Sequence, residues 1–143
     1  MIVNNNIIEQ FLNSMEYNIL ITSKIHELEY IDAEVIEVGL VLSKKLLEYP
    51  ESERQSLIVE LLKEIVEEHR SDILILKDSE ILFNPYYGLD VVKQIKSLSR
   101  NSKIILVWPG IISDNELIFA EPGYEDYYRY KIDKDLLIER GEQ

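Results

Sequence analysis

Apolar residues recur at helical spacing in several segments of this chain. The first segment predicts a helix over residues 4–16, with apolar positions at Ile7, Ile8, Phe11, Leu12 and Met15. A short helix follows, stopped by Pro50, with apolar positions at Leu42, Leu46 and Leu47. The clearest helix comes next, and its apolar stripe consists of Leu57, Ile58, Leu61, Leu62, Ile65 and Val66. Ser52 and Gln55 fit a capping box at its start. A last helix is expected over residues 85–99, with Asn84 as its cap and Pro85 in its first turn.

Short apolar runs between these helices predict strands. Residues 72–76 and 103–108 are almost continuously apolar, which is typical of strands covered on both faces. Further strands are expected at residues 18–22, around Val35 to Val38 with an end near Gly39, at 116–120 and at 127–132. In the last of these, Tyr and Ile alternate with Arg and Lys, so one face should be exposed. The charged tail from Asp133 is expected to be a short helix or frayed. This order predicts one α/β domain over residues 1–143 with a partly parallel sheet.

Composition excludes several classes of function. The net charge of −12 disfavours unaided binding to a nucleic-acid backbone. An acidic protein of this kind could instead mimic DNA towards a DNA-binding enzyme, and that alternative stays open. The chain has no cysteine, so disulfides and thiolate chemistry are excluded. The N-terminal MIVNNNIIEQ does not fit a signal peptide, and no apolar run is long enough for a membrane span. We therefore expect a cytoplasmic protein without a membrane partner.

The segment after the first predicted strand lacks a phosphate loop. Ser23-Lys24-Ile25-His26-Glu27 follows residues 18–22, and the first glycine is Gly39. A phosphate loop needs the pattern G-x-x-x-x-G-K-[ST], because its glycines let backbone amides close on the phosphates. None of the five glycines stands in such a pattern. We expect no nucleotide cofactor and no ATPase activity.

Other catalytic signatures are also missing. The sequence has no G-x-S-x-G nucleophile elbow. Its two histidines have no metal-ligand spacing, and His69 suits the C-terminal end of a helix, where a cation is favoured. Asp78 and Glu80 follow the strand at 72–76, where a magnesium-holding aspartate would lie in an ATPase. Without a phosphate loop they have no nucleotide to serve, so we expect neither catalytic nor metal-binding residues.

Aromatic residues gather in the second half of the chain. Trp108 ends a buried strand just before Pro109-Gly110. The turn Glu121-Pro122-Gly123 is followed by four tyrosines, namely Tyr124, Tyr127, Tyr128 and Tyr130. Tyrosine and tryptophan are favoured at protein interfaces because a large apolar body carries a polar tip. The same residues could equally fill the core and the sheet edge, and the sequence leaves both interpretations open.

Four motifs from this part of the chain occur together in one known family. They are SKKLLEYPESER, EILFNP, SLSRN followed by a strand and WPG, and AEPGYEDYYRY. In this order, over Val35 to Tyr130, they resemble BrxF, the small P-loop-containing subunit of type 3 BREX (bacteriophage exclusion) systems. The resemblance implies a three-layer, P-loop-NTPase-like (AAA-like) fold. It also implies a role in antiphage defence beside an ATPase, a DNA methyltransferase and an alkaline-phosphatase-like protein.

The chain departs from the family at the nucleotide site. Family members place the phosphate loop and a helix after the first strand, whereas residues 23–30 are too few for both. Lys77 stands where the family has an aspartate, and Asp78 comes one residue later. We therefore expect a scaffold truncated after the first strand and a non-catalytic interaction subunit of a defence complex.

Residues for contact with the protein partner are predicted from the second half of the chain. They are Arg100, Trp108, Pro109, Gly110, Glu121, Tyr124, Tyr127 and Tyr128. Arg100 could serve as an arginine finger towards a partner ATPase, or simply as a basic residue at a helix C-terminus. Residual ATP binding through Lys24, Lys77 and Asp78 remains an alternative. The sequence also leaves open whether the chain forms homo-oligomers.

Overall fold

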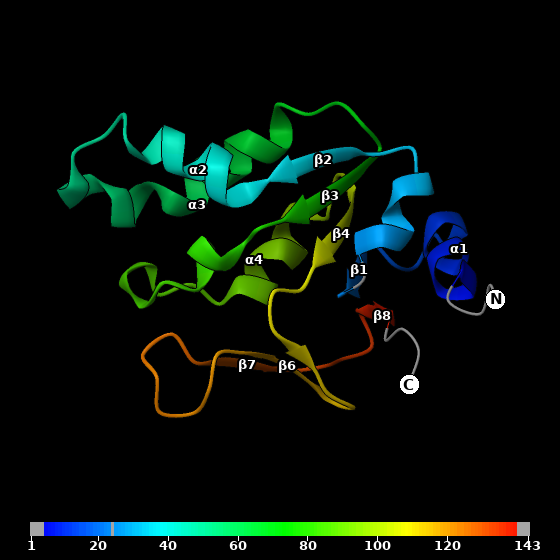
Figure 1. The fold of residues 1–143 in the computed structure, drawn as a ribbon. Coiled ribbons are helices and arrows are strands. Elements are labelled where there is room, and N and C mark those ends of the chain that lie inside the picture. The colour runs from blue at the N-terminus through cyan, green and yellow to red at the C-terminus, as the bar shows by residue number, and fades with distance from the viewer. Residues whose placement is uncertain (1–4, 24, 140–143) are drawn as a thin grey trace.

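The chain folds around a parallel sheet with helices on both faces (Figure 1). This structure is a computed structural model that describes residues 5–23 and 25–139, and the side chains of all of these except residues 5, 6 and 25–27. A small antiparallel sheet lies between the last two strands of the parallel sheet along the chain. The predicted α/β architecture with a partly parallel sheet is thereby confirmed.

Five strands form the main sheet in the order β2-β3-β4-β1-β8, and every neighbouring pair is parallel. The strands are β1 (Ile19–Thr22), β2 (Glu34–Glu37), β3 (Ile73–Lys77), β4 (Lys103–Val107) and β8 (Leu137–Glu139). Alternate side chains of a strand point to opposite faces of the sheet. Leu74 and Leu76 of β3 therefore enter one core, while Ile75 enters the other. This explains the continuous apolar runs of β3 and β4.

Helices cover the two faces unequally. The helices α2 (Val38–Leu46), α3 (Glu51–Glu67) and α4 (Val91–Leu98) pack on one face and bury the larger core. The helix α1 (Asn5–Asn13) and the 3₁₀ helix η1 (Ile25–Tyr30) lie on the other face. The predicted stripe of α3 is confirmed, because Ile58, Leu61, Leu62, Ile65 and Val66 are all buried. No described helix is long and apolar enough to cross a membrane.

Lys103 fastens α1 to the start of β4. Its ammonium donates hydrogen bonds to the carbonyl oxygens of Phe11 (2.5 Å), Ser14 (2.7 Å) and Tyr17 (3.1 Å). It also lies 4.6 Å from the centroid of the Phe11 ring. Carbonyl groups at the end of a helix have no partner within that helix, so one cation satisfies part of the α1 terminus and the chain beyond it. Burial lowers the pKa of Lys103.

The connections that follow β3 and β4 carry the remaining elements. Two 3₁₀ helices, η2 (Glu80–Phe83) and η3 (Pro85–Tyr87), lie between β3 and α4. After β4 the chain forms the antiparallel sheet β5-β6-β7, with strands β5 (Ile111–Ile112), β6 (Glu116–Phe119) and β7 (Tyr128–Lys131). In β7, Tyr128 and Tyr130 are half-buried while Arg129 and Lys131 are exposed. The predicted exposed face of this strand is confirmed.

Three helix predictions were wrong in detail. The helix expected over residues 85–99 begins only at Val91, because Gly88 adopts a left-handed conformation (φ 59°) and Asp90 caps the helix. The capping box of Ser52 and Gln55 does not form, since α3 already begins at Glu51 and its cap position is Pro50. Met15 lies beyond the end of α1 and is 98% exposed.

Two strand predictions also need correction. The second strand ends at Glu37, and Gly39 lies in the first turn of α2. The tail from Asp133 is neither helical nor frayed over residues 137–139, because these residues pair with β1 as β8. The two-residue strand β5 was not predicted.

Gly110 allows β5 to approach β6. A Cβ atom at this position would lie 2.0 Å from the carbonyl oxygen of Ile118. We expect Gly110→Ala to lower the free energy of unfolding by about 3 kcal/mol, because the obstacle is backbone and cannot rotate away. Chemical denaturation would measure this loss.

Ile111→Ala is a matched control, because Ile111 is adjacent and 64% exposed. We expect it to change the free energy of unfolding by less than about 1 kcal/mol. Equal effects of the two substitutions would show that the close approach at Gly110 is not a constraint.

Candidate functional site

Ligands of open α/β proteins bind at the carboxyl ends of the strands, which in this protein include the ends of β1, β3 and β4. β1 ends at Thr22, whose carbonyl oxygen accepts a hydrogen bond from the Trp108 amide at 2.8 Å. The connection from β1 to β2 contains η1 and no glycine. The described part of the connection after β1 therefore has no glycine loop in which backbone amides could surround a phosphate. Lys24 lies outside the described residues, and so does the side chain of His26.

The end of β3 is occupied by contacts within the protein. The Lys77 ammonium lies 3.5 Å from the Glu37 carboxylate on the neighbouring strand. Asp78 is exposed and adopts a left-handed conformation (φ 52°). Its carbonyl oxygen accepts the Gly39 amide at 2.9 Å, which anchors the start of α2. No group of three or more His, Cys, Asp or Glu side chains in the described residues could hold a metal ion.

Trp108, Pro109 and Gly110 connect the two sheets and are not an open surface. Trp108 is only 3% exposed, and its indole N–H donates to the carbonyl oxygen of Ile118 at 2.9 Å. Pro109 and Gly110 are half-buried. Trp108 could have been an interface residue or a core residue, and in the structure it lies in the core.

An aromatic cluster fills the space between the main sheet and the small sheet. We use this name for Phe83, Trp108, Phe119 and Tyr128. Phe83 lies at its centre, with ring centroids 5.4 Å from Trp108, 4.2 Å from Phe119 and 5.3 Å from Tyr128. The rings of Phe83 and Phe119 stack, and the other two contacts are edge-to-face, the geometries that aromatic pairs prefer.

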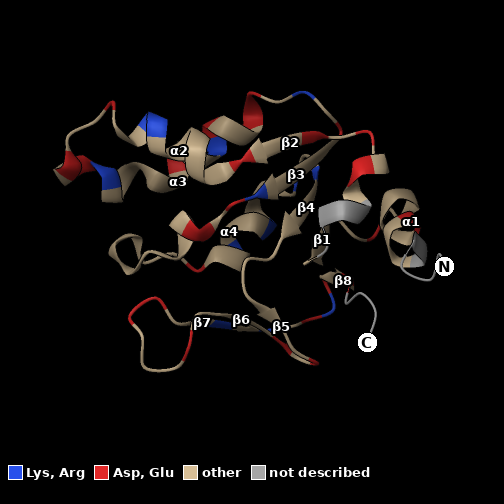
Figure 2. Ribbon diagram, in the orientation of Figure 1, with Lys and Arg blue, Asp and Glu red and all other residues tan. Residues whose placement is uncertain are grey.

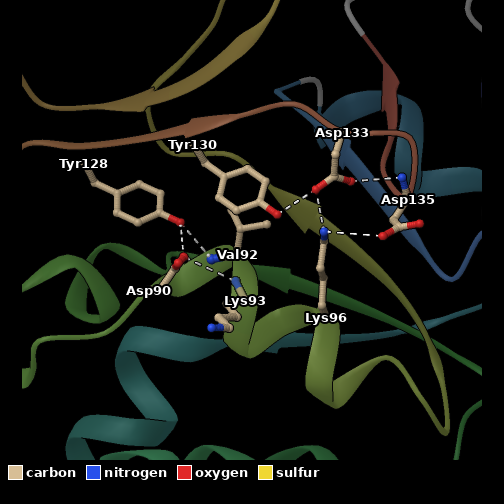
Figure 3. A network of polar contacts seen from close by, with 8 residues as sticks. All are labelled: Asp90, Val92, Lys93, Lys96, Tyr128, Tyr130, Asp133 and Asp135. Atoms are coloured by element: carbon tan, nitrogen blue, oxygen red, sulfur yellow. Dashed lines mark hydrogen bonds and ion pairs between the residues drawn. The ribbon is translucent and has the colours of Figure 1, made fainter.

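The hydroxyl of Tyr128 fixes the start of α4 (Figure 3). It donates a hydrogen bond to the Asp90 carboxylate at 2.6 Å and accepts one from the Val92 amide at 3.1 Å. The same carboxylate oxygen accepts the Lys93 amide at 3.4 Å. Burial and the bond to Asp90 raise the pKa of Tyr128 far above its usual value. Tyr128 thus acts as a second cap of α4, reached from β7.

A second polar group ties β7 and the chain just after it to the last turn of α4 (Figure 3). The Asp133 carboxylate lies 2.5 Å from the Lys96 ammonium and 2.7 Å from the Tyr130 hydroxyl. Burial alone would lower the pKa of Lys96, but the hydrogen bonds and charges of Asp133 and Tyr130 outweigh it and raise the pKa. Burial alone would raise the pKa of Asp133, but the hydrogen bonds from Lys96 and Tyr130 outweigh it and lower the pKa.

An open groove lies where the connection after β3 meets the connection between β6 and β7. It has a volume of about 470 Å³ and is lined by Asn84, Pro85, Tyr124, Glu125 and Asp126. Tyr124 is 64% exposed. We call these residues, together with Glu121, the loop surface. It carries three carboxylates and no basic group, so it suits a basic partner.

The predicted partner residues fall into separate regions. Glu121 and Tyr124 belong to the loop surface, whereas Tyr128 is engaged by Asp90 and Tyr127 is half-buried. Arg100 is exposed beyond the C-terminal end of α4, away from the start of that helix, which Tyr128 contacts. It borders a hollow that also includes Lys93, Gln94, Lys96 and Ser97. The structure therefore does not bring Arg100 together with the loop surface, and its role as an arginine finger stays a prediction.

Sequence reasoning missed Asp90, Lys96 and Asp133. Asp90 could have been recognised from the sequence, because a short polar residue directly before an apolar helical segment commonly caps that helix. No local pattern indicates Lys96 and Asp133, because they are 37 residues apart in the chain.

Removal of the Tyr128 hydroxyl should destabilise the fold. Tyr128→Phe leaves the ring in the aromatic cluster but removes one donor and one acceptor at the start of α4. We expect the free energy of unfolding to fall by about 1–2 kcal/mol in chemical denaturation. Tyr124→Phe is the matched control, and its effect should stay within about 0.5 kcal/mol because that side chain is exposed.

The Lys96–Asp133 pair should make stability depend on pH. Its contribution is complete above the ordinary carboxyl pKa of 3.8 and is lost as the pH falls through the lowered pKa of Asp133. At the alkaline end it is complete below 10.5 and is lost as the pH rises through the raised pKa of Lys96. Asp133→Asn should therefore cost about 1 kcal/mol near neutral pH, a modest loss because the carboxylate is 36% exposed.

The difference between Asp133→Asn and wild type should shrink as the pH falls below 3.8, as measured by thermal unfolding across pH. Asp135→Asn is the control, because Asp135 is 68% exposed and lies 3.6 Å from Lys96. A loss for Asp133→Asn that does not change with pH would exclude the ion pair as its cause.

Comparison with protein-family models, with curated proteins and with solved structures finds no match to this chain. The fold and the loop surface therefore rest on the chain's own sequence and geometry.

Proposed function

We propose that this chain is a non-catalytic interaction subunit of a bacterial antiphage defence complex of the BREX type. It contacts a larger ATPase or DNA-modifying subunit of that complex. The observation that carries the proposal is the combination of a parallel sheet and a connection after β1 that contains no glycine. Together with the family motifs, this combination favours an ATPase-like scaffold without an ATP site.

The architecture supports such a scaffold. β1 lies inside the sheet between β4 and β8, and helices cover both faces. A strand in this position directs its carboxyl end into the crevice where α/β proteins bind nucleotides. The finer assignment, a three-layer P-loop-NTPase-like (AAA-like) fold, is part of this proposal.

The end of β3 argues against residual ATP binding. Lys77 is paired with Glu37, so it would have to leave a carboxylate before it could meet a phosphate. The Asp78 backbone is already bonded to Gly39 at the start of α2. Phosphate binding through Lys77 would therefore require its ion pair with Glu37 to break, which makes an interaction role the better supported of the two.

We assign the contact with the partner to the loop surface. Tyr124 offers a large apolar ring with a polar tip, and Glu121, Glu125 and Asp126 surround it with negative charge. Interfaces often centre on such an exposed aromatic residue, while surrounding charges select the partner and speed association. A basic surface on the larger subunit would complement it.

Affinity capture of the tagged protein from its native cells tests the proposal. We expect a large ATPase, methyltransferase or alkaline-phosphatase-like protein to be recovered and identified by mass spectrometry. The double variant Tyr124→Ala/Glu125→Lys should recover at least tenfold less of that partner, because it removes the exposed ring and reverses one charge.

Met15→Ala provides the control, since it truncates an exposed apolar residue outside the loop surface. It should recover as much partner as the wild type. Equal recovery with the loop-surface variant would remove this surface from the interface. Recovery of none of the three proteins, together with binding of MgATP in calorimetry, would overturn the proposed function.

A further inference from the structure

The outer edge of β2 has no strand beside it among the described residues. β2 is the first strand in the order β2-β3-β4-β1-β8, and β3 is its one strand neighbour. At the opposite edge, β8 is in contact with α1. The outward backbone groups of an edge strand are free to pair with another chain, and β2 is therefore a place where a strand can be added.

Apolar side chains are exposed next to this edge. Ile36 of β2 is buried in the larger core, so Val35 points to the opposite face, where it is 53% exposed. Tyr30, just before β2, is 91% exposed, and Leu40, just after it, is 52% exposed. An added strand could cover apolar surface here as well as pair with the backbone.

The chain around β2 is acidic. Residues 28–37 contain four acidic residues and no basic one, and Figure 2 shows their negative charge on β2 and on the segment that leads into it. Glu34 accepts the Ser71 amide at 2.9 Å, and Glu37 pairs with Lys77. The side chains of Glu29 and Asp32 are exposed, and their carboxylates make no hydrogen bond or ion pair with another described residue. Two carboxylates therefore remain available for positive charge on a partner.

A second copy of the chain does not suit this edge. The sequence of β2 is Glu-Val-Ile-Glu. Residues 28–37 of each copy carry four acidic residues and no basic one, so pairing two β2 strands would bring eight acidic residues together. In a parallel pair in register, each glutamate would also lie opposite itself. Like charges brought together across a strand pair destabilise it, so the complementary occupant is basic.

We propose that the outer edge of β2 binds an extended, basic segment of a partner protein as an additional strand. Lysine or arginine side chains of the segment face Glu29 and Asp32, and its alternate apolar side chains cover Val35. This site is separate from the loop surface, so it does not depend on the proposed function.

Two synthetic peptides of equal charge test the proposal. The probe is acetyl-KVKVKVK-amide, and the control is the same peptide with alternate backbone amides N-methylated, which removes donors without changing side chains. We expect the probe to bind the full chain at least tenfold more tightly in calorimetry. We also expect it to slow amide hydrogen exchange within residues 34–37, as followed by NMR.

Charge-reversal variants test whether Glu29 and Asp32 contribute to binding of the basic segment. Glu29→Lys/Asp32→Lys should weaken binding of the probe at least fivefold, whereas Glu53→Lys/Glu60→Lys on exposed positions of α3 should change it less than twofold. Equal binding of the two peptides, no binding, or unchanged exchange at residues 34–37 would overturn the proposal. Association of the chain with itself through residues 34–37 would also overturn it, because the occupant would then be a second copy.

The outcome is independent of the partner capture experiment. Tyr124→Ala/Glu125→Lys should bind the probe as the wild type does. Loss of partner recovery with intact probe binding would therefore concern the loop surface alone, whereas failure of the probe with intact partner recovery would concern β2 alone.

Discussion

The contact between Phe83, Trp108, Phe119 and Tyr128 joins the two sheets of this protein. Each ring comes from a different element or connection, namely η2, the end of β4, β6 and β7. Without this cluster, the small sheet would have too little apolar surface to fold by itself, since three short strands need packing against another layer. The position of the loop surface depends on the cluster, because its residues lie on connections that leave η2 and join β6 to β7.

Polar contacts give this apolar junction a defined register. Trp108 satisfies its indole N–H on Ile118, and Tyr128 satisfies the start of α4. Lys96 of α4 and Asp133, just after β7, add an ion pair. Apolar packing is not directional, whereas each of these bonds is satisfied in one arrangement only. Together they fix how β7 lies on α4.

Sequence patterns predicted the elements that are strongly periodic or continuously apolar. The stripe of α3 and the runs of β3 and β4 were predicted because burial on one or both faces determines them. The start of α4 was wrong because Gly88 and Asp90 interrupt a segment whose apolar spacing alone continues to Pro85. β8 was missed because three residues in a charged tail become a strand only through pairing with β1, more than 100 residues away.

The candidate site was less predictable than the fold. The alternation of residues 127–132 predicted that one face of this strand is exposed, but no local pattern shows that the Tyr128 hydroxyl contacts Asp90 while Tyr124 stays exposed. The missing phosphate loop could be read directly, because it depends on glycines at fixed spacing. The resemblance to BREX subunits remains a prediction from motif order.

The pairing of β1 has a consequence for the synthesis of the chain. Both neighbours of β1 come from the second half of the sequence, since β4 begins at Lys103 and β8 at Leu137. During translation, the apolar segment Ile19–Thr22 therefore has no strand to pair with until most of the chain has left the ribosome. An unpaired apolar strand is prone to aggregate, so the nascent chain would be a substrate for chaperones until β4 becomes available for pairing.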